Sequence, residues 1–194
     1  MIDTVICGIR FSDLIIQMEE FHGYRSPGIL VGGLMLDVAQ EEMKPTPYLN
    51  AVTETVVCLP DAVQLLTPCT IGNGFLQIMD WGKFALTLYD RTTLSGVRTW
   101  LNADVLARFS LIRQWFERKT PAEAKPPFEK LAAEILEARG DLIRHRPVRL
   151  HRALKDSQHV TTIRCPECGE FYPKRLGPVC PACKGDAYFT YYPV

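Results

Sequence analysis

The chain has 194 residues, of which 47% are hydrophobic and 23% charged, which are ordinary values for a globular protein. Basic and acidic side chains each total 22, so the formal net charge is zero and excludes no class of partner. The sequence has no apolar run of about 18 residues, and its N-terminus lacks the basic start and apolar core of a signal peptide. We therefore expect a cytoplasmic protein without a membrane span, with one core and a small appendage.

Two helices are predicted near the N-terminus. Apolar residues recur every three or four positions over residues 11–20, and a second helical pattern covers residues 29–43. Gly28, Gly32 and Gly33 lie in or beside the second pattern, although glycine costs roughly 1 kcal/mol relative to alanine inside a helix. These small residues predict that another backbone or a ligand packs very close to this helix.

The middle of the chain is predicted to form an antiparallel sheet. Alternating and β-branched residues predict strands at residues 50–58, 75–79, 83–89 and 96–101. A short helix at residues 61–66 follows the first strand, and Asp80, Trp81 and Gly82 form a predicted hairpin turn between the second and third strands. Helices follow at residues 104–118 and 122–138, and they have more apolar residues than one buried stripe requires, which predicts a homodimer.

The predicted fold class is α+β, with a mostly antiparallel sheet packed with helices and a small C-terminal module of the zinc ribbon or treble-clef type. Residues 1–138 form the predicted core domain. Residues 139–164 hold seven basic and two acidic side chains, and they are predicted to be a basic helix end and linker. Residues 165–194 form the predicted metal-binding module.

Four cysteines in this last segment have the spacing of a metal site. They form two Cys-x-x-Cys pairs separated by eleven residues, namely Cys165, Cys168, Cys180 and Cys183. Four thiolates suit zinc and leave no open coordination position, so the predicted zinc is structural. Disulfides are the alternative, but seven cysteines with four in metal spacing fit a reducing compartment better.

Three short segments carry polar or sulfur-bearing side chains at the ends of predicted elements, where a scaffold aims side chains into a cleft. These segments are residues 21–28, 58–64 and 67–74. We predict that His22, Cys58 and Cys69 converge and could hold a second divalent metal, with Asp61 supporting them. Each residue alone also fits an inert structural role, since cysteine is among the most buried residue types.

Four motifs follow one another in a fixed order in this part of the chain. They are Phe21-His22-Gly23-Tyr24-Arg25-Ser26-Pro27-Gly28, then Cys58-Leu59-Pro60-Asp61-Ala62-Val63-Gln64, then Thr67-Pro68-Cys69-Thr70-Ile71-Gly72-Asn73-Gly74, and Asp80-Trp81-Gly82-Lys83-Phe84-Ala85-Leu86-Thr87. These motifs resemble the signatures of the formylmethanofuran dehydrogenase E-subunit family. Many members of that family also end in a zinc-finger module. The resemblance covers about residues 12–101 and 165–194.

The chain departs from the family pattern at three positions. Tyr24 replaces a histidine, Ser26 replaces a cysteine, and Asn73 replaces a lysine. Tyrosine and serine are harder ligands than imidazole and thiolate, and Ser26 excludes disulfide chemistry at its position. The resemblance implies a pocket formed by His22, Tyr24, Ser26, Cys58, Asp61, Cys69 and Lys83.

The resemblance also implies a function. The family is named after a subunit associated with a molybdenum or tungsten enzyme, so we expect an accessory subunit of such redox enzymes or a stand-alone relative that binds metal. One alternative is an independent metal-dependent enzyme whose substrate the sequence does not identify. The other is a nucleic-acid-binding zinc-finger protein, although the module itself balances three basic with three acidic residues.

Overall fold

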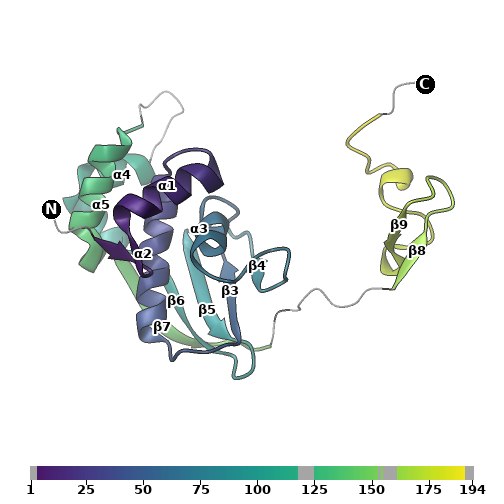
Figure 1. The fold of residues 1–194 in the computed structure, drawn as a ribbon, viewed down its shortest axis with the longest axis horizontal. Coiled ribbons are helices and arrows are strands. Elements are labelled where there is room, and N and C mark those ends of the chain that lie inside the picture. The colour runs from purple at the N-terminus through teal and green to yellow at the C-terminus, as the bar shows by residue number, and fades with distance from the viewer. Residues whose placement is uncertain (1–3, 118–124, 153, 155–160, 191–194) are drawn as a thin grey trace. The chain divides into compact units, whose positions relative to one another are not determined.

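The computed structural model describes residues 4–117, 125–152, 154 and 161–190 (Figure 1). The chain forms two compact units, residues 1–154 and residues 155–194, which are described separately below. Within the described ranges, no helix is both long enough and apolar enough to cross a membrane.

A five-stranded sheet in the order β4-β3-β5-β6-β7 forms the centre of the first unit. Its strands are β3 (Leu49–Thr53), β4 (Leu76–Ile78), β5 (Ala85–Asp90), β6 (Ser95–Leu101) and β7 (Ile143–Arg149). All neighbouring strands are antiparallel except β3 and β4, which are parallel. The α+β class and the mostly antiparallel sheet are therefore confirmed.

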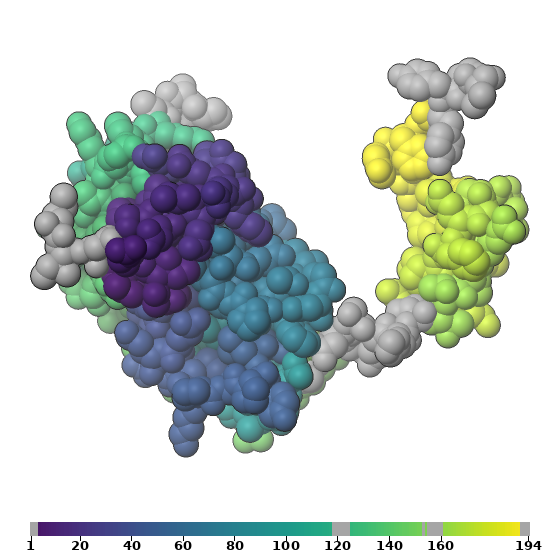
Figure 2. Space-filling view, viewed as in Figure 1, coloured from purple at the N-terminus to yellow at the C-terminus, as the bar shows by residue number. Residues whose placement is uncertain are grey.

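Helices cover one face of this sheet. They are α1 (Phe11–His22), α2 (Pro27–Glu42), α3 (Leu59–Leu66), α4 (Ser110–Phe116) and α5 (Phe128–Leu142). Figure 1 shows α2 crossing the sheet, and it packs against α3, α5, β5, β6 and β7. In the space-filling view, the purple and blue segments of α1 and α2 form much of the visible face of the core unit, with green and teal segments beside them (Figure 2). A small hairpin of β1 (Val5–Ile6) and β2 (Ile9–Arg10) precedes α1.

The hydrophobic core lies between α2 and the sheet. Leu86 and Leu88 alternate along β5 and pack with the buried residues of α2, which is apolar around most of its circumference. Gly32 permits the close contact between α2 and α3, because a Cβ atom there would lie 2.6 Å from the Cβ of Ala62. The close neighbour that these glycines predict is therefore helix α3 at this position.

The predicted hairpin between residues 75–79 and 83–89 is wrong. Strand β3 lies between β4 and β5, and α3 forms the crossover that brings β4 parallel to β3. The turn at residues 80–82 instead passes the end of β3, where the backbone N–H groups of Trp81 and Lys83 donate to the carbonyl of Glu54. The residue pattern of a strand does not specify which neighbour it pairs with, so the strand order could not be predicted from the local sequence.

After residue 101, the observed boundaries of the helices and strands differ from the predicted ones. Residues 103–108 form a 3-10 helix, η1 (Ala103–Arg108), ahead of the shorter α4. Helix α5 begins at Phe128 and runs to Leu142, while the start predicted at residue 122 lies outside the described residues. Within the segment predicted as helix end and linker, residues 143–149 form β7, paired antiparallel with β6. This strand has exposed arginines and Pro147 in place of an apolar strand pattern, so it was not predicted. Both features are typical of a strand at a sheet edge.

The second unit is a small module around the cysteines. Strands β8 (Thr162–Arg164) and β9 (Phe171–Pro173) form an antiparallel hairpin. Two short 3-10 helices follow, η2 (Lys174–Leu176) and η3 (Ala182–Lys184). Tyr172 packs with Cys165 and Cys180 in its core, and the Tyr172 hydroxyl donates to the Gly177 carbonyl at 2.6 Å.

Candidate functional site

The four cysteines of the second unit form a cluster that fits a zinc ion. Their sulfur atoms all lie within 4.8 Å of one another, and the Cys168 and Cys180 sulfurs are 3.9 Å apart. Tetrahedral zinc with Zn–S bonds of about 2.3 Å separates its ligand sulfurs by roughly 3.8 Å. Cys165 and Cys180 are buried, whereas Cys168 and Cys183 are exposed. The site therefore has the ligand set and size of a structural zinc centre.

Backbone turns hold both cysteine pairs in position. The N–H of Gly169 donates to the Cys165 carbonyl at 3.0 Å, and the N–H of Lys184 donates to the Cys180 carbonyl at 3.1 Å. Gly169 and Gly185 follow these turns with φ values of 78° and 118°, which glycine adopts without strain. Backbone N–H groups of Cys180 and Cys168 lower the pKa of Cys165 to about 6, which favours the thiolate that zinc requires.

In the first unit, His22 and Asp61 form a close pair. His22 is the last residue of α1, and Asp61 lies in the first turn of α3. The Nδ1 atom of His22 lies 2.6 Å from Oδ2 of Asp61, and the histidine side chain is 15% exposed. When Asp61 is ionised it accepts a hydrogen bond from Nδ1–H, which leaves the lone pair on Nε2. That Nε2 atom is buried and has no hydrogen-bond partner among the described residues.

Cys58 lies next to this pair in sequence, at the N-cap of α3. Its φ of 56° is unusual for a residue other than glycine, and such backbone conformations occur often at functional sites. The Ser26 hydroxyl donates to the Cys58 sulfur at 3.5 Å. Gly28 allows this approach, because a Cβ atom there would lie 2.6 Å from both the Cβ and the Sγ of Cys58. The start of α2 and the start of α3 therefore meet at this thiol.

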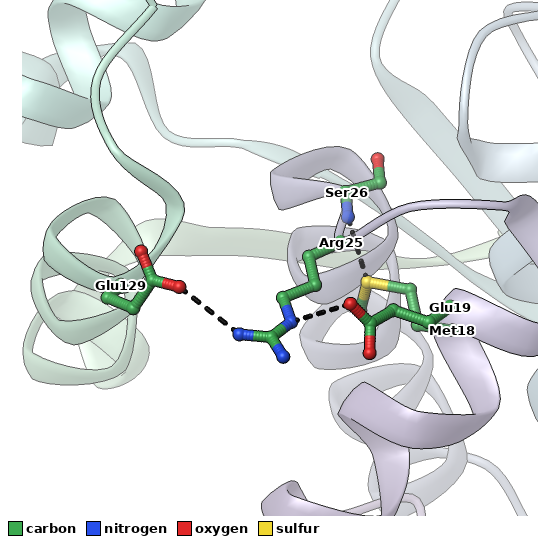
Figure 3. Close-up of polar contacts among 5 residues, drawn as sticks. All are labelled: Met18, Glu19, Arg25, Ser26 and Glu129. Atoms are coloured by element: carbon green, nitrogen blue, oxygen red, sulfur yellow. Dashed lines mark hydrogen bonds and ion pairs between the residues drawn. The ribbon is translucent and has the colours of Figure 1, made fainter.

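Arg25 fixes the loop that joins α1 to α2. Its guanidinium donates to Glu19 of α1 at 2.9 Å and to Glu129 of α5 at 3.2 Å (Figure 3). Next to it, the N–H of Ser26 donates to the sulfur of Met18 at 2.9 Å. Because the ion pairs are exposed, they position the loop more than they stabilise the fold. No local sequence pattern indicates this arrangement, because Arg25 and Glu129 are 104 residues apart.

The other predicted pocket residues, Cys69, Lys83 and Tyr24, have different surroundings. Cys69 is fully buried and its sulfur donates to the Leu49 carbonyl at 3.4 Å, and burial raises its pKa. The Lys83 ammonium lies 5.7 Å from the centre of the Trp81 ring. Tyr24 is exposed, with its ring centre 4.5 Å from that of His22.

Across the described ranges, the four terminal cysteines form the one group of three or more metal-binding side chains within 4.8 Å of one another. His22, Cys58 and Cys69 do not form such a group. The structure therefore brings together two pairs, His22 with Asp61 and Ser26 with Cys58, at the junction of α1, α2 and α3.

The α+β core and the four-cysteine module define the class of protein, a small α+β protein that ends in a zinc finger. Within that class, the chain belongs to the FmdE family. The model described as "FmdE, Molybdenum formylmethanofuran dehydrogenase operon" matches residues 21–149, and the "FmdE treble clef zinc finger" matches residues 157–190.

A solved structure and a curated protein are similar to this chain. One is the crystal structure of a "tungsten formylmethanofuran dehydrogenase subunit e (fmde)-like protein" from Syntrophus aciditrophicus. Its sequence is 35% identical to this chain, and the two structures match with a TM-score of 0.85, covering 98% of this chain and 100% of that chain. A "Probable S-adenosyl-L-methionine-binding protein" of Archaeoglobus fulgidus is 32% identical over 108 residues, or 52% of this chain. The match covers only 30% of that relative's length.

Proposed function

We propose that this protein is an accessory subunit or a stand-alone relative of the FmdE type. Its core presents a His/Cys pocket formed by His22, Ser26, Cys58 and Asp61, and its terminal module holds a structural zinc. The observation that carries the proposal is the buried Nε2 of His22, which lacks a partner among the described residues while Asp61 holds Nδ1.

This arrangement of His22 is suited to binding a ligand or an ion. A buried polar atom without a partner costs about 1–3 kcal/mol, and a bound group that meets Nε2 would offset that cost. Histidines that bind metals usually donate their second ring N–H to a carboxylate, as His22 does to Asp61. Imidazole and thiolate together favour a borderline ion such as zinc, with water or a bound molecule completing the coordination.

Each side chain of the pocket has a distinct role in this proposal. Asp61 orients the imidazole, and His22 binds the ion or accepts a proton through Nε2. Cys58 contributes a sulfur at the N-terminal end of α3, and the Ser26 hydroxyl donates to that sulfur. A bound ion would supply positive charge that stabilises the Cys58 thiolate.

Metal content measured on protein purified without added metal tests the proposal. We expect two divalent ions per chain in the wild type and one in His22→Gln and Cys58→Ser, because each variant removes a ligand of the inner ion. His145→Gln, an exposed histidine of β7, is the matched control and should keep both ions. A single ion in the wild type that persists in His22→Gln would contradict the inner metal.

An independent enzyme is the second candidate, and the His22–Asp61 pair favours it because a carboxylate-oriented imidazole can act as a general base.

The Archaeoglobus relative's name makes S-adenosyl-L-methionine a ligand to test, although the matched part is a minor share of that protein. Calorimetric titration with this compound should give saturable binding that His22→Gln weakens. Absence of binding would remove this ligand from consideration.

The proposed partners are a second copy of the chain and subunits of a redox enzyme. The family model's description places members in a dehydrogenase operon, which supports the second partner. Light scattering at micromolar concentration should give the mass of a dimer. A concentration-independent monomer mass would contradict the homodimer.

A further inference from the structure

The face of the sheet that points away from the helices carries a pocket of about 360 Å³. Leu86 and Leu88 of β5 point to the helices, so Thr87 between them points to the opposite face. Its cross-strand neighbours Val52 and Arg98 share that face. All three line the pocket, which therefore lies on the other side of the sheet from the His22–Asp61 pair.

Apolar side chains form most of the wall of this pocket. They come from three separate parts of the core unit and are Val52, Met79, Trp81, Val148, Leu150 and Leu154. Trp81 is 64% exposed, and its backbone N–H donates to the Glu54 carbonyl at 3.1 Å, which fixes the backbone at this residue beside the pocket. A flat aromatic surface of this kind suits a flat or extended apolar group.

The floor of the pocket holds a paired charge. The Arg98 guanidinium donates to both carboxylate oxygens of Glu54, at 2.6 and 2.7 Å, and the glutamate side chain is only 6% exposed. Because this ion pair is bidentate, Glu54 is neutralised and does not repel an anion.

The rim carries positive charge that the described part of the chain does not neutralise. Arg152 lines the pocket and forms no ion pair with a described acidic residue. Arg149 also borders it, but its position between Val148 and Leu150 directs its side chain to the opposite face of the sheet. Glu54 is the single acidic residue that lines it, and Arg98 occupies that carboxylate. The pocket therefore combines an apolar interior with one guanidinium group, that of Arg152, which no described carboxylate pairs, and this favours an organic anion.

We propose that this pocket binds a small organic anion in which a flat or extended apolar group is joined to a carboxylate or phosphate. The apolar group lies against Trp81, and the anionic group lies beside Arg152. The volume matches the lower end of small-molecule sites, which begin at about 300 Å³. The proposal does not depend on the His22 pocket, because the two sites share no residue.

Fluorescence titration with 1-anilinonaphthalene-8-sulfonate tests the proposal, since this probe joins aromatic rings to an anionic group. We expect saturable binding to the full-length wild type that Trp81→Ala weakens about tenfold, from lost stacking. Arg152→Gln should weaken binding about fivefold and flatten its salt dependence. Arg113→Gln, an exposed arginine of α4, is the matched control and should bind as the wild type does.

Circular dichroism melts establish that each variant is folded, and competitors identify the ligand. Octanoate and adenosine monophosphate share the proposed chemistry, and displacement of the probe by one of them distinguishes an acyl carboxylate from a nucleotide. Probe binding that is unchanged in both folded pocket variants would overturn the proposal. A wild-type dimer that excludes the probe, and that Trp81→Ala dissociates, would also overturn it, because a second copy would then cover this face.

Discussion

At the scale of single residues, the three cysteines of the core unit have different environments. Cys7 is largely enclosed, its sulfur donates to the Gly33 carbonyl at 3.4 Å, and its backbone N–H donates to Asp37. Burial, with a further contribution from the Asp37 charge, raises the pKa of Cys7 to about 12. Cys69 is buried and hydrogen-bonded to backbone, whereas Cys58 is only half-buried. Cys58 is therefore the core thiol best placed to meet a ligand.

The raised pKa of Cys7 predicts a loss of stability in alkaline solution. Between pH 9 and pH 12 the unfolded chain loses the thiol proton while the folded chain keeps it, so raising the pH favours unfolding. The cost approaches about 1.4 kcal/mol per pH unit in this window and is absent below it. Urea unfolding at pH 8 and pH 10 should show that the wild type loses about 1 kcal/mol more than Cys7→Ser. Equal losses in the two proteins would contradict this.

At the scale of elements, the contact between α2 and α3 shapes the candidate site. Gly28 and Gly32 lie on the side of α2 that meets Cys58 and Ala62, and each would place a Cβ atom 2.6 Å from its neighbour. Real Cβ atoms do not approach so closely, so the two helices would have to separate. The position of Cys58 beside Ser26 therefore depends on glycine in the partner helix.

Two glycine substitutions test this contact with opposite expected signs. Gly28→Ala should lower the free energy of unfolding by about 1–3 kcal/mol, because the added methyl group overpacks the contact with Cys58. Gly140→Ala in α5 is the matched control, since its Cβ would meet no atom within 4 Å. It should raise that free energy by roughly 0.5–1 kcal/mol through helix propensity. Denaturant unfolding measures both, and a neutral Gly28→Ala would argue against the close contact.

At the scale of the whole molecule, the chain combines a core unit with a hydrophobic core and a terminal module held around four thiols. The buried core of the module is small, and it consists mainly of Tyr172, Cys165 and Cys180. A module of this size buries too little apolar surface to fold alone, so zinc binding supplies much of its folding free energy.

Removing one zinc ligand should therefore unfold the module alone. In Cys180→Ser we expect the loss of one zinc per chain and rapid proteolysis within residues 161–190, while residues 4–117 remain protected. Cys7→Ser is the matched control, because it removes a thiol outside the cluster and should keep the zinc. Unchanged zinc content in Cys180→Ser would contradict the assignment of this residue as a ligand.

The α+β class, the helices α1, α2 and α3, and the four-cysteine cluster could all be predicted from the sequence. These features depend on local patterns, namely apolar periodicity, turn residues and the spacing within each Cys-x-x-Cys pair. A ligand pair separated by two residues is placed by its own turn, so its geometry follows from the sequence nearby. The predicted domain boundary at residue 138 missed β7, because an exposed, arginine-rich edge strand lacks that apolar signal.

The strand order and the residues that meet at the inner pocket depend on tertiary packing and could not be predicted from local patterns. The crossover through α3 placed β4 beside β3, and this removed the predicted hairpin. Packing of α1 against α3 brought His22 to Asp61, 39 residues away, whereas Cys69 turned into the core. Such contacts between distant segments depend on how whole elements pack. A cysteine can line a pocket or lie in a core, and its sequence position alone does not distinguish the two.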